Sequence, residues 1–187
     1  MTKYFALQDT PELKYAPRLK NVFGKFDIRD IQLETYPKLP ERQVFFVEPS
    51  EKNIFTDIIL SPFLLITPTV LDVIKMYKEL CFYREVFLID QLQRKSQLYF
   101  LPVFNETKKL QVVGKEYDNG TCISKPAERQ GEKVFVDKNI FWVSDSLKRH
   151  TIISMDFAES LIRREVFGLG LKEVELYRKI EERSNLR

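Results

Sequence analysis

Apolar and polar positions follow two different periods in the last third of the chain, where the pattern is clearest. Thr151-Ile152-Ile153 is an apolar, β-branched run that is typical of a buried strand. Ser154 follows at a helix N-cap position, where its hydroxyl can accept a hydrogen bond from an unpaired helix N–H. Asp156 in the first turn suits the positive end of the helix. Helical spacing then predicts one apolar face, made of Phe157, Ala158, Leu161, Ile162 and Val166.

Two glycines after this helix predict its end. Gly168 and Gly170 interrupt the helical pattern, and Val174 and Leu176 then alternate like a strand. A further strand, written Ile-Phe-Trp-Val, precedes the unit at 140–143. The segment from 140 to 177 is therefore a predicted strand–helix–strand unit.

A similar unit is expected from residue 63 to residue 90. Leu64-Leu65-Ile66 predicts the strand, Thr67 the cap, and Pro68 the first helical position, where its missing N–H costs nothing. A constant shift of 87 residues superposes Ile66 on Ile153. Duplication explains this match, and so does chance, because any unit of this kind would align as well. The predicted helix face is Val70, Val73, Ile74, Tyr77 and Cys81, and the predicted closing strand carries Phe87 and Ile89.

The other elements are short predicted strands. Apolar runs predict strands at 4–7, 44–47 and 134–136, and the residues from 97 to 104 are expected to form a hairpin with 110–113. The chain is read as one domain over 1–187. Its predicted parts are a proline-containing arm (1–57), the first unit and hairpin (58–113), a flexible loop (114–131), and the second unit with a polar tail (132–187).

The length, the composition and the predicted elements favour a single α+β domain, which is mostly antiparallel sheet with two or three packed helices and an internal pseudo-repeat. Of 187 residues 44% are hydrophobic, which excludes general disorder, and 30 basic against 27 acidic residues leave a charge of only +3. No apolar run approaches the roughly 18 residues of a membrane span, and the first residues lack a signal peptide's apolar core. Two distant cysteines, Cys81 and Cys122, fit free thiols. We therefore expect a cytoplasmic protein without membrane contact.

Candidate chemistry is sparse. The one histidine, His150, is expected to be a turn residue, and Cys81, at a predicted helix end, is badly placed for a nucleophile. One histidine and two distant cysteines do not favour a zinc site, and we expect neither metal nor cofactor. Glu173 and Glu175 are read as a solvated pair. The sequence thus predicts no enzyme, although a carboxylate-based site stays open as an alternative.

Basic residues gather towards the end of the chain, interleaved with glutamates. This interleaving favours ion pairs between residues four apart on a helix over a surface that follows phosphates, so nucleic-acid binding is the first alternative function and not the leading one. The basic residues are Lys148, Arg149, Arg163, Arg164, Lys172, Arg178, Lys179, Arg183 and Arg187.

The order of features from 140 to 176 resembles a bacterial family of unknown biochemical activity, whose members are assigned as immunity proteins of polymorphic toxin systems. The residues that fit its C-terminal signature are Ile140, Phe141, Ile153, Ser154, Asp156, Leu161 and Gly168 or Gly170. The strand and cap at 64–67 resemble an earlier unit of the family, and Trp142 stands where the family has a basic residue.

This resemblance implies a non-catalytic protein-binding module that neutralises a cognate protein, such as a toxin domain, by occluding it. It supplies no catalytic residues and does not indicate the oligomeric state. Protein interfaces favour an aromatic or arginine-anchored centre, so the expected contact residues are Tyr99, Tyr117, Trp142 and Arg149, together with the 114–131 loop.

Overall fold

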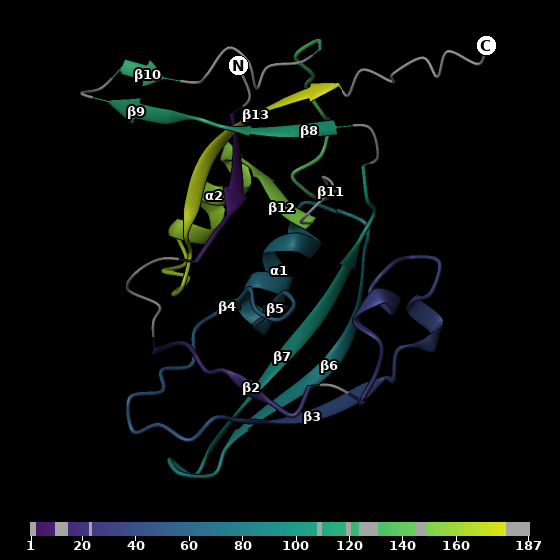
Figure 1. Ribbon diagram of the computed structural model, residues 1–187, viewed down its shortest axis with the longest axis vertical. Coiled ribbons are helices and arrows are strands. Elements are labelled where there is room, and N and C mark those ends of the chain that lie inside the picture. Colours follow the sequence, from purple (N-terminus) through teal and green to yellow (C-terminus); the bar gives the residue numbers. More distant parts are fainter. Residues whose placement is uncertain are drawn as a thin grey trace, which may run out of the picture.

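Two large β-sheets, a two-stranded sheet and two α-helices make up the described part of the fold (Figure 1). The computed structural model describes residues 3–9, 15–22, 24–107, 110–118, 121–123, 131–144 and 149–178. The upper sheet of Figure 1 has the order β11-β12-β1-β13-β8, and the lower sheet has the order β2-β3-β6-β7-β5-β4. The mixed α+β class and the single domain predicted from the sequence are confirmed.

The strands of each sheet come from separate parts of the chain. The upper sheet contains β1 (Tyr4–Leu7), β8 (Leu110–Gly114), β11 (Ile140–Ser144), β12 (Arg149–Ser154) and β13 (Leu171–Arg178). The lower sheet contains β2 (Leu19–Lys20), β3 (Arg42–Val47), β4 (Ile58–Ile59), β5 (Leu65–Ile66), β6 (Cys81–Asp90) and β7 (Lys95–Phe104). A separate hairpin joins β9 (Glu116–Asp118) and β10 (Thr121–Ile123). Among these strands, β3 and β6 pair in parallel and the other pairs are antiparallel.

The two predicted strand–helix–strand units share one topology. Helix α1 (Pro68–Met76) joins β5 to β6, and helix α2 (Met155–Ile162) joins β12 to β13. In each unit a third strand lies between the two and runs antiparallel to both: β7 in the lower sheet and β1 in the upper sheet. The joined strands are therefore parallel to each other. In the lower sheet the intervening strand, β7, directly follows β6 in the sequence. In the upper sheet the intervening strand, β1, comes from the other end of the described chain.

The helices begin largely as the sequence predicts. Pro68 occupies the first helical position of α1, and the Ser154 hydroxyl accepts the N–H of Phe157 at 3.2 Å to cap α2. Thr67 stands at the N-cap position of α1 but makes no cap bond. Its hydroxyl instead donates to the Asp57 carboxylate at 2.6 Å, which ties the start of α1 to the preceding segment.

Both helices end earlier than predicted. Helix α2 stops at Ile162, so Ile162 is 58% exposed and does not share the buried face of Phe157 and Leu161. Helix α1 stops at Met76, and Cys81 begins β6 instead of ending a helix. Burial raises the pKa of the Cys81 thiol to about 12, which keeps it protonated at neutral pH.

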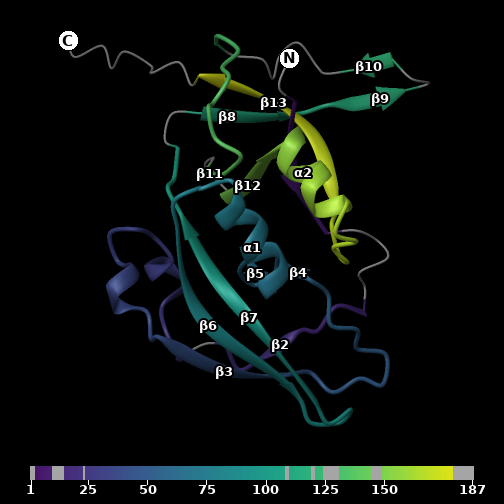
Figure 2. The same ribbon diagram turned by 180° about the vertical axis from the view of Figure 1, so that it is seen from behind.

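The helices meet where the two sheets approach each other, as Figures 1 and 2 show. The rings of Tyr77, just after α1, and Phe157 of α2 lie 5.3 Å apart, and the Tyr77 hydroxyl donates to the Asp156 carbonyl at 2.8 Å. The main core joins both helices to both sheets. A second core lies on the opposite face of the upper sheet, where Val134 and Val136 cover Phe141 and Ile152. The upper sheet is thus covered on both faces.

Three strand predictions were wrong. Residues 95–104 pair with β6 instead of forming a hairpin with 110–114, which pairs with β13 in the other sheet. Residues 134–136 form no strand, although they pack on the upper sheet. His150, expected in a turn, lies within β12. Within the predicted arm, the described residues 15–22 and 24–41 include β2 and the 3-10 turns η2 (Ile28–Asp30) and η3 (Tyr36–Lys38). The predicted polar tail beyond residue 178 lies outside the described residues.

Candidate functional site

A cleft of about 720 Å³ lies at the junction of the arm with the two sheets, and we call it the junction cleft. The upper sheet contributes Trp142, Ser144, Arg149 and Thr151. The β11–β12 register pairs Trp142 with Thr151 and Ser144 with Arg149, so alternation along two neighbouring strands places all four side chains on one face. The facing walls come from three segments: residues 28, 29, 31 and 32 of the arm, residues 60–64, and residues 101–102 of β7. Leu7, Gln8 and Asp9 also line the cleft.

Arg149 and Trp142, two of the four predicted contact residues, are in direct contact here. The Arg149 guanidinium carbon lies 4.4 Å from the centre of the Trp142 ring, within the range of a cation–π interaction. Its Nη1 donates to the carbonyl of Ile31 at 2.8 Å, and its Nη2 lies 3.7 Å from the Glu106 carboxylate. Burial lowers the pKa of Arg149 and the Glu106 charge partly restores it, but a guanidinium stays protonated at neutral pH.

The position of Trp142 explains why this pair is rigid. Its ring is 3% exposed and packs edge-on against Phe104 at 5.4 Å, so it forms a floor beneath the arginine. The bond from Arg149 to Ile31 holds the same guanidinium against the arm. The side chain of Arg149 is still 30% exposed, so its remaining N–H groups can reach the cleft.

The other two predicted contact residues do not join this pair. The structure corrects the expectation for Tyr99, which is 0% exposed in the core, where its hydroxyl donates to the Thr56 carbonyl at 2.6 Å. Burial raises the pKa of Tyr99, so it stays a neutral donor. Tyr117 lies in β9, but its side chain is outside the described part of the structure. Half of the predicted 114–131 loop is also outside it, and residues 116–118 and 121–123 form β9 and β10.

A second surface covers one face of the lower sheet. The register pairs Val44 with Phe87 and Phe87 with Leu98, which makes one apolar row across β3, β6 and β7. Phe46 and Ile89 form the next row. Val44, Phe46 and Phe87 are 42%, 41% and 36% exposed, and Ile89 and Leu98 are half-buried. We call these five residues the apolar sheet face.

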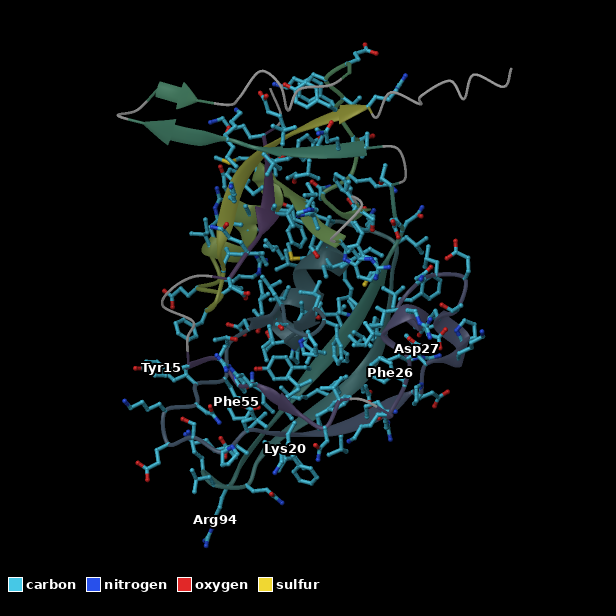
Figure 3. The ribbon with its side chains drawn as sticks, viewed as in Figure 1. Tyr15, Lys20, Phe26, Asp27, Phe55 and Arg94 are labelled. Carbon is cyan, nitrogen blue, oxygen red and sulfur yellow. The ribbon has the colours of Figure 1, made fainter. Side chains whose placement is uncertain are left out.

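The opposite face of the same strands shows that this exposure is a property of one side only. Phe45, Val86 and Leu88 alternate with the residues of the apolar sheet face and are fully buried. They belong to the main core together with residues of the arm and of both helices, and the ring of Phe26 in the arm lies 6.3 Å from that of Phe45. At the far end of the lower sheet Arg94, in the β6–β7 turn, projects away from the core (Figure 3). The sequence predicted Phe87 and Ile89 in a strand, which is confirmed, but it did not predict this surface.

The glutamate pair on β13 is less solvated than predicted. The side chains of Glu173 and Glu175 are 15% and 12% exposed, and the ammonium groups of Lys115 and Lys133 lie 2.7 Å from them. The hydrogen bond from Lys133 lowers the pKa of Glu175, further helped by Tyr177. A lowered pKa keeps a carboxylate ionised at neutral pH, whereas a general acid needs a raised pKa. This arrangement is typical of a structural ion-pair cluster.

The basic C-terminal residues are partly neutralised. Arg163 lies 3.5 Å from the Glu159 carboxylate, the spacing of four residues that the sequence predicts on a helix. Lys148, Lys179, Arg183 and Arg187 are outside the described residues. Among those described, no group of three or more histidine, cysteine or carboxylate side chains is close enough to hold a metal ion.

Comparisons of the chain with protein-family models, with curated proteins and with solved structures found no match. In the described part of the chain, neither helix has the length and apolar character needed to cross a membrane.

Proposed function

We propose that the chain is a non-catalytic, cytoplasmic protein-binding module that occludes a cognate protein, in the manner of the immunity proteins that its C-terminal unit resembles. The apolar sheet face is the observation that carries this proposal. It gathers Val44, Phe46 and Phe87 at exposures above one third, in register, on a rigid sheet. Contiguous exposed apolar residues on a folded protein mark interaction sites, whereas singly exposed ones are ordinary.

The chemistry of this face defines the kind of partner. Two phenylalanine rings with aliphatic neighbours favour a partner that presents its own apolar surface, because each buried ring contributes mainly through removal from water. A stable interface buries roughly 1,200–2,000 Å² in total, more than five side chains supply, so the contact has to extend onto the rim. Exposed charged side chains lie beside the face: Lys20 pairs with Phe46 in the register, and Arg42 and Glu48 flank Val44 and Phe46 along β3, with Arg42 ion-paired to Glu85 at 2.6 Å.

The test uses a matched pair of variants. The double variant Phe46→Ser/Phe87→Ser removes both aromatic anchors, whereas Phe135→Ser removes a ring that is 51% exposed on the segment covering the upper sheet. Sedimentation first establishes whether the chain associates with itself. A tagged chain and both variants are then used to recover proteins from a lysate, and the recovered protein is purified and titrated against all three forms.

We expect the partner to bind the original chain and Phe135→Ser equally, and the double variant at least about tenfold more weakly. Equal binding by the double variant would contradict the proposal. Loss of self-association in the double variant alone would replace it with a homodimer. Recovery of nucleic acid that washes off as salt rises would support the alternative of a nucleic-acid-binding protein.

A further inference from the structure

We propose that the junction cleft is a second, independent binding site, which takes a small apolar molecule carrying one anionic group at Arg149. The site lies apart from the apolar sheet face, on the wall formed by the upper sheet and the arm. It therefore does not depend on the protein-binding function proposed above.

The size and lining of the cleft fit a small molecule. Ligand pockets measure about 300–1,000 Å³, and the junction cleft measures about 720 Å³. Ile28 and Ile31 of the arm, Phe63 and Leu64 of the segment before α1, and Leu101 of β7 supply apolar walls. Gln8, Gln32, Ser61 and Thr151 place polar groups between them, so the lining is mixed and offers hydrogen-bond partners to the polar end of a ligand.

Arg149 is fixed before any ligand arrives. The Trp142 ring below it and the Ile31 carbonyl beside it hold the guanidinium plane, so little side-chain freedom remains to be lost on binding. A guanidinium has five N–H donors, and the hydrogen bond described for Arg149 uses one of them. A carboxylate, sulfonate or phosphate can accept two parallel bonds from such a group.

Of the charged groups around the cleft, Arg149 is the one placed to bind an anionic group of a ligand. Arg29 also lines the cleft, but it chelates the Asp27 carboxylate with contacts of 2.6 to 3.0 Å. Glu106 lies 3.7 Å from Arg149, too far for a short hydrogen bond, and its contact leaves part of the guanidinium exposed. Asp9 is the acidic group among the described lining residues, and it opposes ligands with more than one negative charge.

The single tryptophan of the chain gives the test a local reporter. Trp142 is the only tryptophan, and it forms the floor beneath Arg149. The probe is 8-anilinonaphthalene-1-sulfonate, an apolar body with one sulfonate, and its uncharged counterpart is N-phenyl-1-naphthylamine. Probe fluorescence measures the affinity, and the indole N–H resonance of Trp142 reports whether the probe enters the cleft.

We expect the sulfonate to bind and to shift the Trp142 resonance. Arg149→Leu should weaken sulfonate binding about tenfold or more and change binding of the neutral probe less than about twofold. Arg149→Lys should restore part of the loss, because it keeps the charge without the planar fork. Arg163→Leu, which removes an exposed arginine directly after α2, is the matched control and should bind as the original chain does.

The outcomes separate this proposal from the protein-binding one. The variant Phe46→Ser/Phe87→Ser should keep sulfonate binding with the same Trp142 shift, since it alters only the apolar sheet face. An unshifted Trp142 resonance, or equal sulfonate affinity in the original chain and a folded Arg149→Leu variant, overturns the cleft proposal. If Arg149→Leu does not fold, Arg149→Lys and the titration of the original chain decide in the same way.

Discussion

The upper and lower sheets share a split strand–helix–strand connection, yet their faces are covered differently. In the upper sheet α2 covers one face and residues 131–136 cover the other, so Ile152 and Ile153, adjacent in β12, are both fully buried. In the lower sheet the adjacent residues Val86 and Phe87 differ, because Val86 belongs to the main core and Phe87 is exposed on the opposite face. The same topology thus gives a closed structural unit in one half and an open apolar surface in the other.

The largest expected effect is the difference in stability lost when a buried ring is removed and when an exposed ring is removed. Phe157→Ala removes a fully buried ring between the helices and should lower the free energy of unfolding by about 3–5 kcal/mol. Phe87→Ala, on the apolar sheet face, should cost less than about 1 kcal/mol, because its ring leaves little cavity behind. Urea denaturation of both variants measures the difference. Similar costs would show that the apolar sheet face is covered in solution.

A smaller effect concerns the place where the two halves join. Gly168 has φ +93°, and a Cβ added there would lie 2.8 Å from the Cβ of Thr56, which lies just before β4 of the lower sheet. Gly168→Ala should therefore cost about 2–3 kcal/mol, from backbone strain plus the clash. Gly24→Ala is the matched control, since Gly24 has φ +87° and open space around it, and should cost about 1 kcal/mol. Thermal unfolding gives both values, and equal losses would mean that the Thr56 contact adds nothing.

The smallest effect is a pH dependence that differs between the sheets. The N–H of Gln93 and the amide of Asn53 lower the pKa of buried Asp90 at the β6–β7 turn, and Lys133 lowers that of Glu175 in the upper sheet. In both cases the unfolded chain binds protons more readily. The stabilisation is therefore present above the unfolded pKa, about 4 for either group, and is lost as the pH falls below it.

We expect Asp90→Asn and Glu175→Gln each to flatten the loss of stability between about pH 5 and about pH 2, by roughly 1 kcal/mol or less. Salt should separate the two residues. It should weaken the Glu175 contribution, which comes from ion pairs, and leave that of Asp90, which comes from hydrogen bonds. Urea unfolding at several pH values, in low and high salt, provides the measurement. Identical salt responses would contradict this assignment of causes.

Local signals in the sequence predicted the two strand–helix–strand units, but they did not predict which strands pair over long distances in the chain. The cap at Ser154 and the proline at Pro68 act within a few residues, so they identify helix starts without knowledge of the fold. The partner of β7 depends instead on the turn at 91–94, where Arg94 has φ +53° and Asp90 accepts the N–H groups of Leu92 and Gln93. That turn lacks glycine and proline, and the later polar turn looked like the stronger hairpin signal.

The candidate surfaces were predictable only in part. Trp142 and Arg149 were identified by residue type, and the β11–β12 register brings them together. Tyr99 was chosen for the same reason but lies on the buried side of β7. The run Val44-Phe45-Phe46-Val47 is apolar on both faces, so alternation cannot tell which face other segments cover. That information lies in the arm, whose irregular sequence gives no periodic signal.

The central place of β1 in the upper sheet bears on synthesis at the ribosome. Tyr4 pairs with Ser154 on one side and Val174 on the other, so β1 leaves the ribosome before the other described strands and has its neighbours only after nearly all of the described chain has followed. The strands of the lower sheet lie between Leu19 and Phe104 and have their partners much earlier. Until β12 and β13 follow, the nascent protein carries an unpaired apolar strand beside a sheet whose strands are already complete, which is the interval when a chaperone has most to shield.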